Sequence, residues 1–295
     1  MGCKPRFDTA TTLADQRAGR RGRVRLHIGC QAWYLLLGLF GSTIQLFVSV
    51  TAVPKIIQME TVYYEGNELE ALANMSNYYA WIFDIFAPWA RGDIIEYGAG
   101  LGTVSERLVP LADRLTLVEP SVQLADALRI RFAGNRWVEI EAESLEIHVA
   151  RTEAHSADTV VLVNVLEHIE DDRAALAHIF RILKPGGHLL IFVPALGFLM
   201  SKFDLMLGHF RRYHRRDLMG KVTESGGEVL VCRYFDLAGI IPWWVAYTLM
   251  GARRVSPTLL RIGDKVLIPV SRAIERIFPA PIGKNLILIA EKPIS

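Results

Sequence analysis

Three glycines at alternate positions separate a strand-like segment from a helix-like segment, and their spacing suits a ligand-binding turn. Gly98, Gly100 and Gly102 follow the apolar run 93–97 and precede a helix predicted over 104–111. Glycine permits a sharp turn and lets the backbone approach a ligand that a Cβ atom would repel. The helix directs free N–H groups and the positive end of its dipole toward the same turn. The spacing therefore predicts a binding site where a strand ends and a helix begins.

An acid further along the chain fits the same site. Glu119 and Pro120 follow a second strand, predicted over 114–118. A carboxylate at the tip of the second strand of such a unit accepts hydrogen bonds from both hydroxyls of a ribose. A tight turn in an α/β domain without any ligand is the competing interpretation, and the second acid argues against it. The turn and the acid together predict nucleoside binding.

Two residues indicate which nucleoside would bind. The dinucleotide fingerprint G-x-G-x-x-G requires its last glycine where Thr103 stands, which disfavours a nicotinamide-dependent oxidoreductase. Glu96 precedes the first glycine by two positions. Its carboxylate suits a ligand with cationic groups better than it suits a pyrophosphate, because like charges repel. The acid therefore disfavours a dinucleotide at this turn.

The pattern Glu96-x-Gly98-x-Gly100-x-Gly102 resembles motif I of the class I S-adenosylmethionine-dependent methyltransferases. Two further segments resemble the same family: L-E-H-I at 166–169, and R-I-L-K-P-G-G at 181–187 before an apolar strand. The resemblance is to the methyltransferase domain 11/12, ubiquinone-biosynthesis-like group. It covers residues 68–235 and the last predicted strand, 285–290.

The order of elements predicts the fold class. Strands and helices alternate as β-α-β-α-β-β-α-β, which indicates an α/β fold with a doubly wound sheet and a ligand at the carboxyl ends of its strands. The resemblance implies a Rossmann-like, mostly parallel sheet of seven strands, preceded by a helix within 68–90 that covers the cofactor. We expect the methyltransferase domain to span 59–295, with 194–280 as an apolar, helical insertion on the substrate side.

The resemblance also implies the cofactor and its ligands. S-adenosylmethionine is the expected cofactor, and Glu143 stands where the family has an acid that accepts the adenine amino group. Asn164 ends the fourth predicted strand, 157–164, at the same edge of the sheet. The expected cofactor-binding residues are Glu96, Gly98, Ala99, Gly100, Gly102, Glu119, Pro120, Glu143 and Asn164.

Methyl transfer from a sulfonium requires alignment and exclusion of water more than an elaborate catalytic group. A hydroxyl acceptor benefits from a base, and His168 is the first candidate, with His209 the second. The ubiquinone-type enzymes have an E-x-x-E-H cluster linked to a metal. Asn164 replaces its first carboxylate here, so we predict no metal. The expected reaction is methylation of a small or lipid-linked acceptor, on oxygen rather than carbon or nitrogen.

A basic segment within 194–213 is the least generic part of the chain. Arg211, Arg212 and Tyr213 follow His209 in the sequence G-H-F-R-R-Y. Arginine side chains bind phosphate and carboxylate groups well, so these residues are candidates for binding an anionic group of the substrate. A solvated basic face is the competing interpretation.

Two apolar segments follow, and their function is open. Residues 237–250 are strongly apolar with paired tryptophans, and 259–278 carry apolar residues at helical spacing with basic residues between them. A core or dimer helix is one interpretation, and an element that contacts lipid is the other. We therefore leave membrane-surface contact open, and the sequence does not indicate an oligomeric state.

The first 58 residues differ in composition from the remainder. An arginine-rich stretch precedes a segment without charge at 28–54, which is long enough to span a bilayer. A membrane anchor, a cleaved signal peptide, or an extension upstream of a start near Met59 are the alternatives, and the signal peptide is disfavoured.

A formal net charge of +2 gives no indication of nucleic-acid binding. Three scattered cysteines suit a reducing compartment, so we expect a cytoplasmic enzyme. Attachment to a membrane is left open. A non-catalytic, membrane-associated interaction module with the same fold is the rival function.

Overall fold

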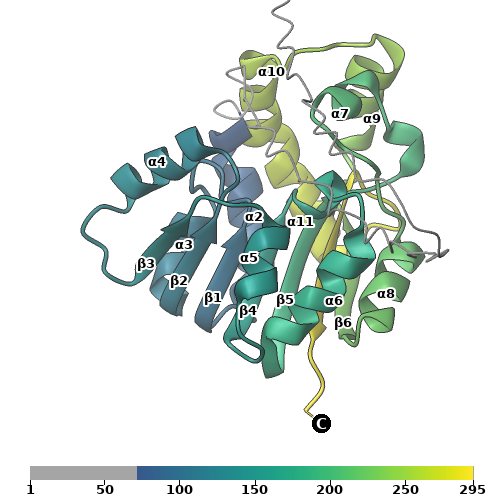
Figure 1. Cartoon of the computed structure of the whole chain (residues 1–295). Coiled ribbons are helices and arrows are strands. Elements are labelled where there is room, and N and C mark those ends of the chain that lie inside the picture. The colour runs from purple at the N-terminus through teal and green to yellow at the C-terminus, as the bar shows by residue number, and fades with distance from the viewer. Residues whose placement is uncertain (1–71, 295) are drawn as a thin grey trace, which may run out of the picture. The chain divides into compact units, whose positions relative to one another are not determined.

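The computed structural model describes residues 72–294, which form one layered α/β domain around a seven-stranded sheet (Figure 1). Its strands lie in the order β3-β2-β1-β4-β5-β7-β6. The strands are β1 (Gly92–Tyr97), β2 (Ala112–Val118), β3 (Val138–Glu141), β4 (Ala157–Val163), β5 (Leu183–Pro194), β6 (Glu228–Phe235) and β7 (Asn285–Glu291). The first five strands are parallel, and β7 runs antiparallel to both β5 and β6. This arrangement confirms the predicted doubly wound, mostly parallel sheet.

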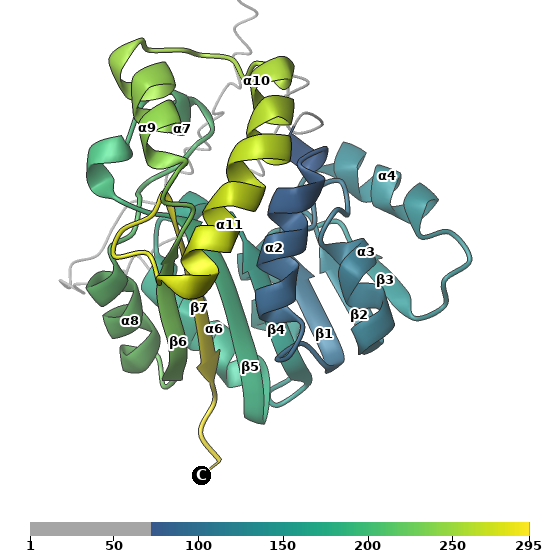
Figure 2. The same cartoon turned by 180° about the vertical axis from the view of Figure 1, so that it is seen from behind.

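Helices cover both faces of the sheet, as Figures 1 and 2 show. Helices α5, α6 and α8 lie on one face, and α2, α3 and α4 lie on the other. Their bounds are α2 (Ser76–Phe86), α3 (Ser105–Leu108), η1 (Val109–Leu111), α4 (Val122–Arg131), α5 (Leu145–Arg151), η2 (Leu166–His168), α6 (Asp172–Ile182), η3 (Gly197–Leu199), α7 (Lys202–Met206), α8 (Arg215–Glu224), α9 (Ile240–Trp243), η4 (Trp244–Leu249), α10 (Pro257–Ile262), η5 (Gly263–Leu267) and α11 (Ile268–Ile277).

The central strands are apolar on both faces because both faces are covered. In β5, Leu189 and Ile191 belong to the core beneath α5, α6 and α8, whereas Leu190 and Phe192 belong to the core beneath α2. All four side chains are fully buried. Side chains of a strand alternate between its two faces, so one apolar run contributes to both cores at once. The run at 157–163 has the same pattern in β4.

Three details differ from the sequence-based expectation. Helix α5 was not predicted, and it begins where the Ser144 side chain accepts a hydrogen bond from the Ile147 backbone N–H. Strand β5 begins at Leu183, so the K-P-G-G segment starts this strand rather than forming a separate turn before it. Residues 194–280 do not form one insertion, because they include strand β6 of the central sheet and helix α8, which covers one face of that sheet.

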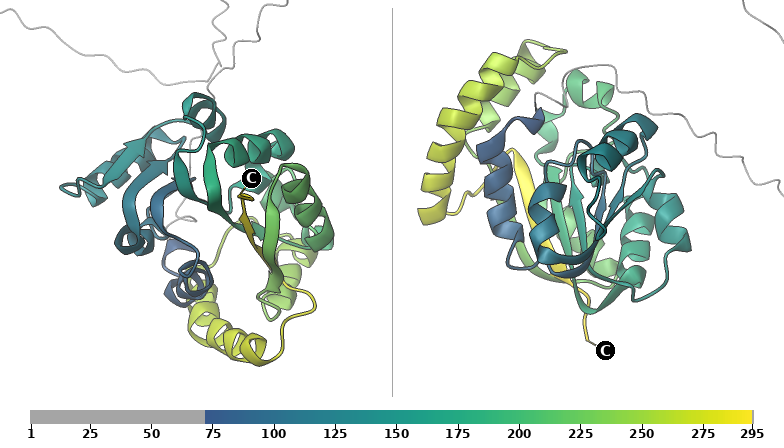
Figure 3. Two further views of the ribbon diagram at one scale, coloured as in Figure 1. Left: turned by 90° about the horizontal axis from the view of Figure 1, so that it is seen from below. Right: turned by 90° about the vertical axis from the view of Figure 1, so that its left-hand side faces the viewer.

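A long C-terminal helical rod lies against α2 on the outer side of the domain (Figure 3). The rod consists of α10, a wider π-type turn at η5, and α11, which follow one another without a break over 257–277. Asp264 of this rod accepts hydrogen bonds from the backbone N–H groups of Asn77 (3.2 Å) and Tyr78 (2.9 Å). These N–H groups belong to the first turn of α2, which has no partner for them within the helix. Asp264 therefore caps α2 from a distant part of the chain.

The expectations for residues 1–58 lie outside the described residues. Among the residues that are described, no helix combines the length and the apolar character that a membrane crossing requires.

We expect Asp264→Ala to destabilise the domain by about 1–2 kcal/mol, because the variant removes a helix cap that is itself buried. Denaturant-induced unfolding, followed by circular dichroism, measures this loss. Asp126→Ala is the matched control, since Asp126 lies on α4 and forms a surface ion pair with Arg129. Equal stability of the two variants would contradict the capping role.

Candidate cofactor and acceptor site

The glycine turn lies at the carboxyl end of β1, beside the ends of β2 and β4. The Gly98 N–H donates to the Val118 carbonyl oxygen at 2.7 Å, which fixes the turn against β2. Gly98 has a φ of 68°, and a Cβ atom there would lie 2.5 Å from Cγ2 of Val165, the second residue after β4. Both the backbone conformation and the close approach exclude other residues at this position. The turn is thus held at the point where the strand order reverses, which is the usual ligand position in such sheets.

Glu119 holds the turn from the end of β2. One carboxylate oxygen accepts the Gly100 N–H and the other accepts the Ser121 N–H, each at 2.9 Å. Burial raises the pKa of Glu119, and these two N–H groups act in the opposite direction by stabilising the carboxylate. Each oxygen retains a lone pair beyond the bond that it already makes. Glu119 can therefore accept two hydroxyl groups without releasing the turn.

Glu96 is buried beneath the same turn. Its carboxylate accepts a hydrogen bond from the Ser105 hydroxyl at 2.5 Å, at the start of α3. Burial raises the pKa of Glu96 to about 8, the Ser105 bond lowers it, and the nearby charge of Glu119 adds to the rise. Burial also raises the pKa of Tyr79 to about 12, with a further contribution from Glu96. A cationic ligand at this turn would stabilise the ionised form of Glu96.

The remaining predicted cofactor residues have different surroundings. Ala99 is buried in the turn, and Pro120 is exposed at the end of β2. Asn164 is exposed at the end of β4 and has a φ of 54°, a strained conformation for a residue other than glycine. Glu143 forms an ion pair with Arg151 of α5, in which Oε1 and Nη2 are 2.5 Å apart. Its carboxylate is thus already partly engaged, which the sequence did not indicate.

The residues around the turn fit a cationic nucleoside such as S-adenosylmethionine. Glu119 supplies acceptors of the kind that a ribose needs, and the glycine turn supplies a surface without side chains. Glu96 supplies a carboxylate that gains charge when a cation is near. The described N-terminal helix contributes Tyr79 beside Glu96, whereas Trp81 packs on Phe235 with ring centroids 3.9 Å apart and belongs to the core.

A second group of polar residues is organised by Asp204 of α7. Asp204 is fully buried and accepts hydrogen bonds from Nε of Arg212 at 2.9 Å and from the Ser201 hydroxyl at 2.6 Å. Nδ1 of His209 lies 3.1 Å from the same carboxylate. The Arg212 guanidinium also donates to the Ala195 carbonyl oxygen just after β5. Asp204 therefore fixes both the basic segment and the orientation of the His209 ring.

His209 lies beside His168 and Glu167, which follow β4. The two imidazole rings meet edge to face, with centroids 4.6 Å apart. Burial lowers the pKa of His168 to about 4, and the neighbouring His209 contributes to this decrease. Burial raises the pKa of Glu167 to about 8, and within residues 72–294 neither of its carboxylate oxygens has a hydrogen-bond partner. One ligand atom from each of the three residues lies within 4.8 Å of the others, a spacing that suits a single cation.

Three of the predicted substrate residues have internal partners. Tyr213 is fully buried, and its hydroxyl donates to Asp172 at 2.8 Å. Arg211 forms an ion pair with the same carboxylate, at 2.7 Å. Arg212 is paired with Asp204, as described above. The expectation that Arg212 and Tyr213 bind an anionic substrate group directly is therefore wrong, because their polar atoms already bond Asp204 and Asp172.

The residues that hold these groups in place are not among the sequence-based predictions. Ser105, Asp172 and Asp204 make the supporting bonds, and they come from three different helices. One sequence signal was available: Ser201 precedes Asp204 by three residues, the spacing of a capping box, and the structure contains that box. No comparable pattern links Asp204 to His209 or Arg212.

Comparisons with known proteins agree with this geometry. Residues 95–189 match the methyltransferase domain family. A ubiquinone biosynthesis O-methyltransferase of Xanthomonas oryzae pv. oryzae is 28% identical over 103 residues, which cover 35% of this chain and 43% of the relative. An uncharacterised methyltransferase of Mycobacterium bovis is 28% identical over 120 residues, or 40% of this chain and 58% of that protein. The chain thus spans less than half the length of the ubiquinone-biosynthesis relatives that it matches.

Solved structures share the fold. An S-adenosylmethionine-dependent methyltransferase of Archaeoglobus fulgidus has a TM-score of 0.52 at 16% identity, covering 76% of this chain and 97% of that chain. A second such enzyme, from Mesorhizobium loti, also has a TM-score of 0.52, at 15% identity over 75% of this chain and 99% of that chain. Identities this low carry information on architecture alone.

We expect Glu167→Gln to stabilise the protein at pH 8 and to have little effect at pH 5. The folded-state pKa of about 8 lies above that of an unfolded glutamate, so the folded protein retains a proton that the unfolded chain releases. Wild-type stability should consequently decrease as the pH rises from the unfolded to the folded pKa. Thermal unfolding measures the difference, which should reach roughly 1–3 kcal/mol at pH 8. The same stability difference at both pH values would show that Glu167 does not titrate in this way.

Proposed function

We propose that this chain is an S-adenosylmethionine-dependent methyltransferase that methylates an oxygen atom of a small or lipid-linked acceptor. The match of residues 95–189 to the methyltransferase domain family supports methyl transfer. The observation that carries the proposal is the glycine turn held by Glu119, whose carboxylate bonds both Gly100 and Ser121. This arrangement, in which the ends of β1 and β2 meet, supports ribose binding at the turn.

The residues of the turn would bind and orient the cofactor. Glu119 would accept the ribose hydroxyls, while the glycines allow the ligand to lie against the backbone. Glu96 would offset the positive charge of the ligand from beneath the turn. When bound, S-adenosylmethionine supplies a methyl group already activated by a sulfonium. The protein then has to align the acceptor and exclude water.

His209 is the residue that we propose as the base for a hydroxyl acceptor. Asp204 lies 3.1 Å from Nδ1 of its ring, so the proton belongs on that nitrogen and Nε2 is left as a proton acceptor. His168 was the first candidate by sequence. Its pKa of about 4 makes it a weaker base, and its ring instead packs against His209. The reaction proposed does not require a metal, because the sulfonium is activated without one.

The acceptor would meet an aromatic wall built by the apolar segments. Phe203 stacks on Tyr247 with centroids 4.7 Å apart, and Tyr247 lies 4.4 Å from Trp243 by the same measure. The Arg212 guanidinium, which Asp204 holds in place, also lies over the Trp243 ring. Its Cζ atom is 4.8 Å from the ring centroid. The wall is therefore joined to the Asp204 group. Such a wall suits an aromatic or isoprenoid acceptor, and the O-methyltransferase relatives support oxygen as the methylated atom.

We expect Glu119→Ala to weaken S-adenosylmethionine binding by about 100-fold, since both the ribose acceptor and the anchor of the turn are removed. Calorimetric titration of the full-length chain measures the affinity. Glu139→Ala is the control, because Glu139 is an exposed glutamate on the neighbouring strand β3. Folded wild-type protein that does not bind the cofactor would contradict the proposal, as would equal binding by both variants.

We expect His209→Ala to lower kcat by about 10²–10⁴ with little change in cofactor affinity, because a positioned base contributes on that scale. Asp204→Asn should lower kcat through the wrong ring tautomer, provided that its fold is confirmed by circular dichroism. His178→Ala is the control, since His178 is exposed on α6. Activity that survives in His209→Ala but is lost in His168→Ala would restore the assignment made from sequence.

A further inference from the structure

The C-terminal helical rod, 257–277, directs an apolar face toward solvent, which is the opposite of an ordinary surface helix. Its exposed face carries a continuous aliphatic stripe at intervals of three or four residues. The stripe consists of Leu259, Ile262, Val266, Val270, Ile274 and Ile277, whose side chains are 51–70% exposed. A surface helix normally directs such a stripe toward the core. This rod instead leaves the stripe uncovered over a length of about 27 Å.

The acids of the rod face inward. Asp264 is buried and caps α2, as described above. Glu275 is also largely buried, and its carboxylate accepts the Leu237 N–H at 2.8 Å and the Ser271 hydroxyl at 2.9 Å. Polar bonds and the buried Ile268 side chain hold the inner face of the rod to the domain. The aliphatic stripe is not needed to attach it, which leaves the stripe available to another surface.

The exposed charges of the segment that contains the stripe have a single sign. Within the described segment 251–282, every exposed charged side chain is basic: Arg253, Arg254, Arg261, Lys265 and Arg276. A helix with an outward apolar face and flanking basic residues is the form that lies in the interface of an anionic bilayer. The methylene stems of lysine and arginine contact acyl chains while their charged ends remain near the headgroups.

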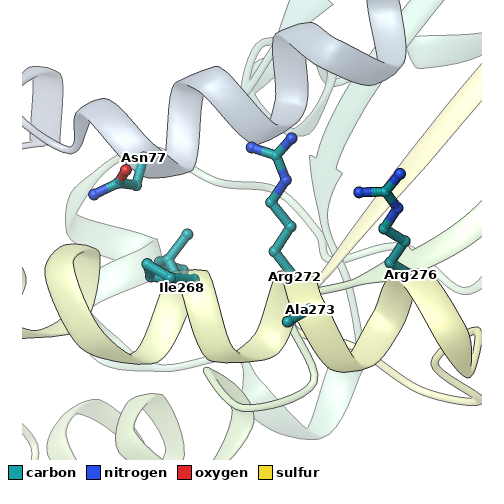
Figure 4. Close-up of a pocket in the computed structure, with 6 residues that line it drawn as sticks. Asn77, Ile268, Arg272, Ala273 and Arg276 are labelled. Atoms are coloured by element: carbon teal, nitrogen blue, oxygen red, sulfur yellow. The ribbon is translucent and has the colours of Figure 1, made fainter.

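A shallow groove of about 320 Å³ lies between α2 and α11, beside the stripe. Figure 4 shows Arg272 and Arg276 extending from α11 toward α2 at this groove. Arg272 is paired with Asp84 of α2. Arg276 has no ion-pair partner among the described residues. Its guanidinium is therefore available to a phosphate group at this groove.

We propose that the stripe and its basic flank dock on the surface of an anionic phospholipid bilayer. Charge complementarity selects this occupant. A second copy of the chain would bring the same basic flank against itself, and like charges across an apolar contact oppose association. Helices α9 and α10 lie at the carboxyl end of the parallel strands, the end that holds the glycine turn (Figures 1 and 2). Docking would thus bring that end of the sheet close to lipid.

Vesicle binding by the full-length chain tests this inference without any methyl transfer, so it succeeds or fails independently of the proposed function. The probes are phosphatidylcholine vesicles with and without phosphatidylglycerol, followed by flotation. We expect binding to the anionic vesicles, weakened by added salt. Ile274→Glu should reduce binding by about tenfold, since it places a charge in the stripe. The pair Lys265→Gln and Arg276→Gln should reduce the dependence on anionic lipid.

Ile130→Glu is the matched control, because Ile130 is 79% exposed on α4, away from the rod. Circular dichroism and thermal unfolding establish that each variant is folded. Equal vesicle binding by Ile274→Glu and Ile130→Glu would overturn the inference, because another part of the chain would then contact lipid. Sedimentation without vesicles provides the second check: self-association that Ile274→Glu abolishes, with vesicle binding unchanged, would identify a second copy as the occupant instead.

Discussion

The parallel register of the central strands is the constraint on which the site depends. Because β1 is flanked by β2 and β4 in the same direction, the residues that follow all three strands meet at one edge of the sheet. Glu119, the glycine turn and the segment around His168 are brought together in this way although they are far apart in the sequence. The covering of both sheet faces makes the register difficult to change, since a shift would expose apolar side chains to water.

Buried carboxylates perform different tasks within this framework. Glu119 is stabilised by two backbone N–H groups and anchors the turn, whereas Glu96 has a single hydroxyl donor and a pKa raised to about 8. Asp204 is ionised, since His209, Arg212 and Ser201 together lower its pKa to about 2 against the effect of burial. The Glu167 carboxylate has no hydrogen-bond partner among the described residues. The number of donors that reach each carboxylate thus decides whether it holds structure, responds to a ligand or carries a proton.

The C-terminal rod is connected to the layered domain by buried polar contacts as well as by apolar packing of Ile268. Asp264 links the C-terminal rod to α2, and Tyr78 of α2 in turn donates to Asn285 at the start of β7. Lys284 lies over the rings of both Tyr78 and Trp243. The rod, the N-terminal helix and the aromatic wall are therefore linked through shared contacts.

Much of the cofactor side was determined by the sequence itself, because it depends on local rules. The glycine spacing, the acid after the second strand and the unbroken apolar runs each follow from backbone sterics or burial within a few residues. The acceptor side was not determined in this way. The same letters that suggest a basic grip, Arg211 to Tyr213, prove to be paired with Asp172 and Asp204 from other helices. Only the tertiary structure decides which charges are neutralised and which apolar faces stay exposed, because both outcomes depend on partners distant in the chain.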